Sequence, residues 1–139
     1  MSPVPSLQLS VIVPVKDEEG AIEPFVARVA PILDGLFPDS PAAPAWEILF
    51  VDDGSEDATM AAIRAAHRRD PRIRAISLSR NFGKEAALSA GLDHAGGQAV
   101  VPIDVDLQDP PEAIGAMLAK WREGYEVVYG VRRNRRNDS

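Results

Sequence analysis

Residues 100–112, VVPIDVDLQDPPE, join a short apolar run to a series of acidic and polar residues. The run Ala99–Ile103 is typical of a buried parallel strand in an α/β protein, and it leads directly into Asp104 and Asp106. Alternate residues of an extended segment point the same way, so the two carboxylates can face one point. Gln108 can join them if the chain stays extended. In open α/β sheets, ligand chemistry occurs just beyond the carboxyl ends of the strands.

The chemistry of these side chains favours a divalent cation. Two carboxylates and an amide oxygen are hard ligands, which suit Mg²⁺ or Mn²⁺ better than zinc. Such an ion keeps several waters and takes the rest of its shell from substrate phosphates. A simpler interpretation is a polar loop in which Asp106 or Asp109 caps the following helix. The segment therefore predicts a metal site of Asp104, Asp106 and Gln108, with a helix cap as the alternative.

Strand and helix patterns alternate along the whole chain. Pro31, inside the first helical pattern, implies a kink or a break. The alternation predicts an α/β fold with a Rossmann-like, mostly parallel sheet flanked by helices, in a single domain over residues 1–139 with loose tails at 1–7 and 132–139. Strands are expected at residues 9–15, 46–51, 73–78, 99–103 and 125–131, and helices at about 19–36, 57–69, 84–94 and 112–122.

Composition narrows the possible functions. The 139-residue chain has no cysteine and a net charge of −6. Disulfides, thiol catalysis and cysteine-ligated zinc are therefore excluded, and nucleic acid is not an expected partner. No apolar run approaches the ~20 residues that span a bilayer, and the first residues lack the basic region of a signal peptide. These features predict a cytoplasmic location.

Three polar clusters follow predicted strands, at Asp17–Glu19, Asp52–Ser55 and Asp104–Gln108. One parallel sheet places all three on the same edge, which is the strongest indication of a binding site. A carboxylate at the end of the second strand can accept a hydrogen bond from a base N–H or a ribose hydroxyl. The alternative is that Asp53 and Ser55 only shape a turn and a helix cap.

A basic segment, SRNFGKEAAL at residues 79–88, precedes the third predicted helix. Arg80 and Lys84 flank Gly83 there, and a helix amino terminus with nearby cations favours phosphate. A solvated basic turn is the alternative. The chain has neither GxGxxG after the first strand nor GxxxxGK[ST], which argues against a Rossmann dinucleotide site and a P-loop.

Five segments in this order and spacing resemble the family 2 glycosyltransferases: LSVIVPVKDEEG, ILFVDDGSEDAT, SRNFGKEAAL, DVDLQDPPE and VVYGVRR. The branch that they resemble includes dolichyl-phosphate mannosyltransferase and the bacterial polyprenyl-phosphate glycosyltransferases. The resemblance covers about residues 8–133 and implies a GT-A fold that binds a UDP- or GDP-sugar with Mg²⁺ or Mn²⁺. It further implies sugar transfer to polyprenyl phosphate at the inner face of the membrane. Family members continue into an acceptor region, so we expect this chain to be the N-terminal catalytic part and to bind donor without using the lipid.

The resemblance also implies a role for individual residues. The Asn that is common before the first-loop glutamate is Asp17 in this chain. Oligomeric state is not predicted, and a homodimer stays open. The implied roles are base-pocket lining for Pro14, Val15, Asp17 and Glu19, base contact for Asp52, nucleotide contact for Lys84, Asp104 and Val105, metal and diphosphate binding for Asp104, Asp106 and Gln108, and catalytic contact with the phosphates or the acceptor for Arg132, together with Asp104 and Asp106.

Two other classes of protein share parts of this pattern. Signalling receiver domains are parallel α/β folds with an acidic pair like Asp52–Asp53, and some phosphatases use the first Asp of a DxD segment as nucleophile. Receivers carry the pair after the first strand and such phosphatases carry DxD on the first strand, whereas here the two motifs follow the second and fourth strands. Acetyl-phosphate labelling, phosphomonoester turnover and nucleoside diphosphate binding would distinguish the three classes.

Overall fold

The computed structural model describes residues 7–38, 44–108 and 110–123, in which four strands alternate with four helices. This alternation confirms the predicted α/β class. Several predictions lie outside the described residues. These are the strand expected at 125–131, the tail at 1–7 apart from Leu7, the tail at 132–139 with Arg132, and Asp109. The elements are β1 (Leu9–Val15), α1 (Ile22–Leu36), β2 (Trp46–Asp52), α2 (Thr59–Arg69), β3 (Ile73–Ser77), α3 (Lys84–His94), β4 (Ala99–Pro102) and α4 (Ala113–Arg122).

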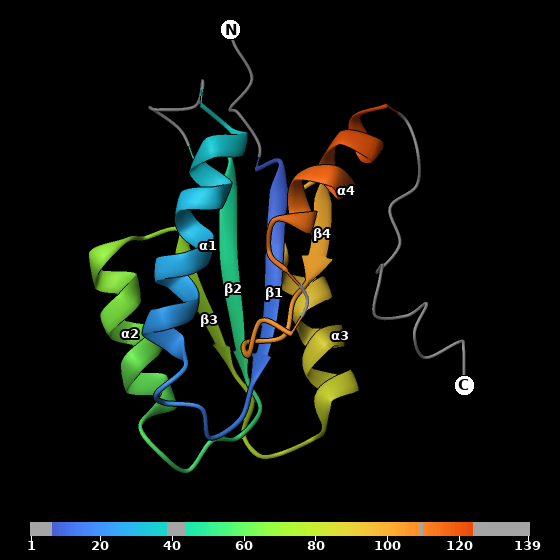
Figure 1. Cartoon of the computed structure of the whole chain (residues 1–139). Helices are drawn as coiled ribbons and strands as arrows, with labels where there is room; N and C mark the ends of the chain where they lie inside the picture. The colour runs from blue at the N-terminus through green and yellow to red at the C-terminus, as the bar shows by residue number, and fades with distance from the viewer. Residues whose placement is uncertain (1–6, 39–43, 109, 124–139) are drawn as a thin grey trace, which may run out of the picture.

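The four strands form one parallel sheet in the order β3-β2-β1-β4 (Figure 1). The chain builds outward from β1 to β3 and then returns to add β4 on the other side of β1. The strand order therefore reverses between β1 and β4, and such a reversal opens a crevice beyond the carboxyl ends of the strands. The loops that follow β1 and β4 flank this point.

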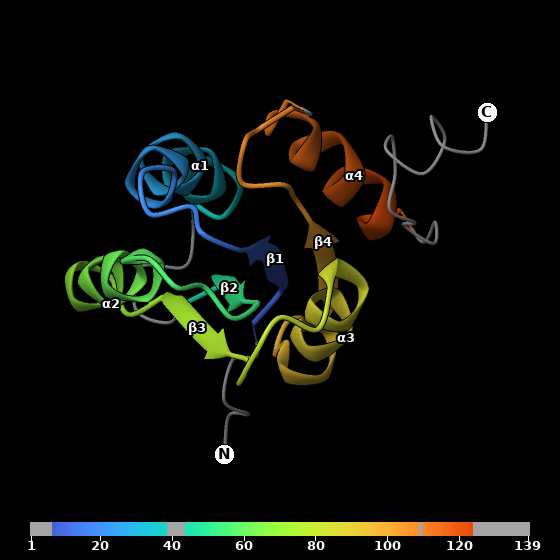
Figure 2. The ribbon, with the colours of Figure 1, turned by 90° about the horizontal axis from the view of Figure 1, so that it is seen from below.

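Helices cover both faces of the sheet, with α1, α2 and α4 on one face and α3 on the other (Figure 2). The change of face accompanies the change of direction after β3, as expected when all crossovers share one hand. The sheet is thus buried on both sides, which explains why most residues of β1 and β2 are apolar.

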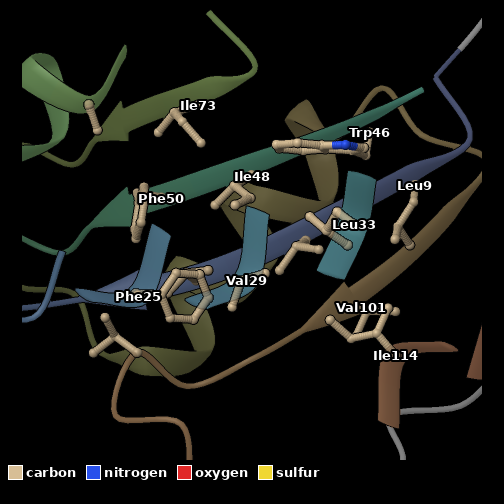
Figure 3. Close-up of a cluster of buried hydrophobic side chains, with 14 of the residues drawn as sticks. Leu9, Phe25, Val29, Leu33, Trp46, Ile48, Phe50, Ile73, Val101 and Ile114 are labelled. Carbon is tan, nitrogen blue, oxygen red and sulfur yellow. The ribbon is translucent and has the colours of Figure 1, made fainter. Parts of the chain in front are cut away.

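The larger core lies between the sheet and α1 (Figure 3). Phe25, Val29 and Leu33 recur at helical spacing and turn one stripe of α1 toward the strands. Phe25 meets Phe50 edge-on, with ring centroids 5.7 Å apart. On the opposite face the core is smaller, and Gly91 lets α3 approach closely, since a Cβ there would lie 2.5 Å from the Ile12 side chain.

Two sequence predictions about the helices need correction. α1 begins at Ile22 instead of about residue 19, because residues 17–19 bond to a neighbouring loop. α1 also continues without a break through Pro31. Pro31 and Ala27 lie on the exposed face, where water can satisfy the carbonyl that loses its helical donor.

Within the residues that the structure describes, no helix is long and apolar enough to cross a membrane.

Candidate functional site

A pocket of about 360 Å³ opens where the strand order reverses. It brings together seven residues that the sequence singled out, and three to which no ligand contact was assigned, namely Lys16, Glu18 and Asp53. Asp17, Glu19 and Asp52 were expected at the site but are not on its wall. The lining residues are Pro14, Val15, Lys16, Glu18, Asp53, Lys84, Asp104, Val105, Asp106 and Gln108.

The acidic segment after β4 reaches the pocket through a turn. β4 ends at Pro102, and the Leu107 N–H donates to the Asp104 carbonyl at 3.1 Å. Leu107 has a left-handed φ of 57°. The segment therefore does not stay extended, because β4 pairs with β1 only as far as Pro102. Asp104, Asp106 and Gln108 still line one pocket, since the turn folds them over its edge.

A cation from α3 meets this acidic segment. The Lys84 Nζ lies 2.7 Å from Asp104 Oδ1, although the two residues are 20 apart in sequence. Lys84 opens α3 and its side chain is 55% exposed. Ion pairs of such exposure contribute only about 0–1 kcal/mol to stability. The pair therefore matters more for the charge pattern of the pocket than for the fold.

Four carboxylates line the pocket, those of Glu18, Asp53, Asp104 and Asp106. Burial raises the pKa of Glu18, and the charges of Asp106 and Asp104 raise it further. A cation would relieve this repulsion. In the described part of the chain, no three or more His, Cys, Asp or Glu residues are grouped so as to hold a metal ion. The donors present instead fit a hard cation that completes its shell with waters and ligand oxygens.

The loop after β1 is fastened to the loop after β2 by alternate residues. The Asp17 N–H donates to Ser55 Oγ at 2.8 Å, and Asp17 Oδ1 accepts from the Glu56 N–H at 2.7 Å. Glu19 Oε1 accepts from the Ala58 N–H at 3.3 Å. Asp17 and Glu19 therefore engage the neighbouring loop instead of the pocket wall.

Two other residues of the same loop face the pocket. Lys16 and Glu18 line its wall, while Asp17 takes a left-handed φ of 53°. Lys16 also bonds Asp17 at 2.9 Å, and this contact lowers the pKa of Asp17. Lys16 and Glu18 share the parity of Pro14 in β1, which is a sequence signal that could have identified them.

The two aspartates at the end of β2, Asp52 in the strand and Asp53 after it, are both buried but have different partners. Asp52 Oδ1 accepts from the Ser55 N–H at 3.1 Å and shapes the turn. Asp53 lies on the pocket wall and accepts from the backbone N–H groups of Phe82 and Gly83 at 2.8 and 3.0 Å. The adjacent acidic residues thus look alike in sequence and separate only in the fold.

Comparison with known proteins identifies the family. The model of "Glycosyl transferase family 2" matches residues 10–139. An uncharacterized glycosyltransferase of Synechocystis is 44% identical over 96% of this chain and 40% of its own length. The bactoprenol glucosyl transferase of Shigella phage SfV is 46% identical over 95% of this chain and 41% of its own. The chain therefore spans about two fifths of the length of these curated relatives.

A solved structure supports the same assignment. The mannosyltransferase PcManGT from Pyrobaculum calidifontis, in complex with GDP-Man and Mn²⁺, superimposes with a TM-score of 0.62 at 28% identity. The match covers 82% of this chain and 32% of that chain. Fold, sequence and pocket agree, and the chain belongs to glycosyl transferase family 2, with the GT-A fold.

Proposed function

We propose that this chain is the donor-binding part of a glycosyltransferase that uses Mg²⁺ or Mn²⁺ and a UDP- or GDP-linked sugar, with polyprenyl phosphate as acceptor. The observation that carries the proposal is the pocket in which Glu18, Asp104, Asp106 and Lys84 meet at the strand-order reversal. The name of the bactoprenol glucosyl transferase relative supports the acceptor. The GDP-Man and Mn²⁺ complex of the mannosyltransferase supports the donor and the metal.

The pocket residues divide the work on the donor. Asp104 and Asp106, with Gln108, would hold the cation, and Lys84 would donate to a phosphate oxygen. When bound, the ion stabilises negative charge on the departing nucleoside diphosphate. Pro14 and Val15 are uncharged residues of the wall, and we assign the base to them.

The other nucleotide contacts implied by the sequence remain proposals. A base contact by Asp17, Glu19 or Asp52 would require the donor to compete with their loop hydrogen bonds. Val105 lies on the wall beside Asp104 and is assigned to the nucleotide.

The acceptor needs little activation. A polyprenyl phosphate already carries a nucleophilic anionic oxygen, so a strong general base is not required. Arg132 is our candidate for contact with the donor phosphates or the lipid phosphate, and action at the inner face of the membrane follows from that acceptor.

Family membership decides against the receiver and phosphatase alternatives. The structure also has the acidic pair at the end of β2 and the DxD segment after β4, and neither motif follows the first strand.

Calorimetric titration with UDP, GDP and CDP, each with Mn²⁺, Mg²⁺ or EDTA, tests the donor assignment. We expect one nucleoside diphosphate to bind in the presence of a divalent ion and to lose affinity in EDTA. Absence of binding by all three to a chain that is folded by circular dichroism would contradict the proposal.

Transfer of radiolabelled sugar to polyprenyl phosphate in detergent tests the acceptor. The bactoprenol glucosyl transferase relative serves as positive control. We expect this 139-residue chain to bind donor without transferring sugar, because the roles that we assign to its pocket residues are all on the donor side. Robust transfer by this chain would show that it holds a complete active site.

A further inference from the structure

Asp53 links two parts of the pocket wall that are distant in sequence, the end of β2 and the loop before α3. It follows β2, it lies on the pocket wall, and it is buried. Its Oδ1 accepts from the Phe82 N–H at 2.8 Å and its Oδ2 from the Gly83 N–H at 3.0 Å. Both carboxylate oxygens are therefore used to hold the loop that precedes α3.

The backbone around Asp53 is fitted to the same loop. Gly54 has a φ of 76°, and a Cβ on it would lie 2.5 Å from the Arg80 carbonyl carbon and the Asn81 nitrogen. The Leu78 N–H donates to the Asp52 carbonyl at 2.9 Å. The turn after β2 thus touches the loop after β3 along most of its length.

The held loop ends in a conformation that sets the direction of α3. Gly83 has φ 103° and ψ 160°, which side-chain-bearing residues rarely adopt. Its carbonyl accepts the Ala87 N–H at 3.0 Å and so starts the helix. Lys84 is the next residue, and its ammonium lies 2.7 Å from Asp104.

We propose that Asp53 is a positioning residue, which holds the start of α3 so that Lys84 meets Asp104 in the pocket. The consequence for donor binding rests on the proposed function, whereas the placement of Lys84 does not. Asp53 acts on Lys84 through the Phe82 and Gly83 N–H groups. An asparagine has nearly the same shape but would direct an amide N–H at one of these donors, so Asp53→Asn disturbs the contact with little change in volume.

The first test measures the position of Lys84 without any ligand. Trace acylation with acetic anhydride, read by mass spectrometry, gives the labelling rate of Lys84 relative to Lys120 on α4. We expect Asp53→Asn to raise this ratio at least threefold. Asp57→Asn is the matched control, because Asp57 also accepts from backbone N–H groups but in the loops after β1 and β2. Its ratio should equal that of the wild type.

An unchanged ratio in folded Asp53→Asn would overturn the proposal. If that variant does not fold by circular dichroism, Asp53→Ser takes its place, since its hydroxyl keeps one acceptor without the charge. An unchanged ratio in Asp53→Ser would overturn the proposal equally.

The second test is a double-mutant cycle on Mn²⁺-dependent affinity for the nucleoside diphosphate that the wild type binds. We expect Asp53→Asn and Lys84→Ala each to weaken binding, and the double variant to match Lys84→Ala within twofold. If the double variant instead shows the product of the two single-variant losses in affinity, Asp53 acts on the ligand independently of Lys84, which would overturn the positioning role. A wild type that binds no nucleoside diphosphate would count against the proposed function alone, because the labelling ratio still decides the placement of Lys84.

Discussion

Replacing Glu47 by alanine should remove the side-chain hydrogen bonds that hold the segment before β4 against the sheet, at the end opposite the pocket. The Glu47 side chain is only 1% exposed. Its Oε2 accepts from Ser10 Oγ at 2.6 Å and from the Gly96 N–H at 2.8 Å, and its Oε1 accepts from Arg74 at 2.8 Å. Ser10 Oγ in turn accepts from the Gly97 N–H at 2.8 Å. The network therefore joins β1, β2 and β3 to the segment that leads into β4.

The expected cost follows from the partners that lose an acceptor. In Glu47→Ala the buried Ser10 hydroxyl loses its acceptor, at about 1–3 kcal/mol. Gly96 is exposed and Arg74 is half-exposed, so their N–H groups can return to water. We therefore expect the free energy of unfolding to fall by about 2 kcal/mol. Arg74→Ala should cost less than half of this, because Glu47 keeps two donors.

The same residue predicts a dependence on pH. Burial raises the pKa of Glu47, but the bonds from Ser10, Gly96 and Arg74 outweigh burial and hold the pKa below its ordinary value of 4.5. A carboxyl whose pKa is lower in the folded state stabilises that state when ionised. The contribution should be complete above pH 4.5 and should be lost as the pH falls below it. Glu47→Gln removes this titration.

Urea unfolding followed by circular dichroism measures these effects for the wild type, Glu47→Ala, Glu47→Gln and Arg74→Ala. The gap between wild type and Glu47→Gln should narrow as the pH is lowered from 7 to below 4.5. A loss of less than about 1 kcal/mol in Glu47→Ala, with an unchanged denaturant slope, would refute the reasoning, because it would mean that the Ser10 hydroxyl finds another partner.

Three further substitutions test the site and the core. Asp106→Ala should lower Mn²⁺-dependent nucleoside diphosphate affinity at least tenfold, or about 1.4 kcal/mol, and calorimetry that shows equal affinity would contradict the metal assignment. Gly54→Ala should lower the free energy of unfolding by about 1–3 kcal/mol, because Gly54 has a φ of 76° and a Cβ on it would lie 2.5 Å from the backbone of Arg80 and Asn81. Gly20→Ala is the control, since a Cβ there meets nothing within 4 Å. It should change the free energy of unfolding in urea by no more than about 0.5 kcal/mol. Phe25→Ala should lower the free energy of unfolding by about 3–5 kcal/mol in the same assay. Phe82 is 49% exposed, so Phe82→Ala should lower it by less than about 1 kcal/mol. Equal losses in the two variants would argue against the described core.

Local patterns in the sequence determined the element types and the edge of the sheet that carries the site. Strands β1 and β2 are apolar on both faces, and α1 repeats its buried residues at helical spacing, so both follow from periodicity. Because parallel strands share a carboxyl edge, polar residues after the strands had to gather there. Seven residues singled out on this basis and by resemblance to the family line the pocket, namely Pro14, Val15, Lys84, Asp104, Val105, Asp106 and Gln108.

The tertiary structure alone decided which members of each polar cluster reach the pocket. Asp17 and Glu19 bond to a loop nearly 40 residues away, and Asp53 instead of Asp52 lies on the wall because of where the loop before α3 packs. The reversal of strand order between β1 and β4 also came only from long-range pairing. Hydrophobic periodicity depends on neighbours within a few residues, whereas these choices depend on hydrogen bonds between loops that become adjacent only when the strands pair.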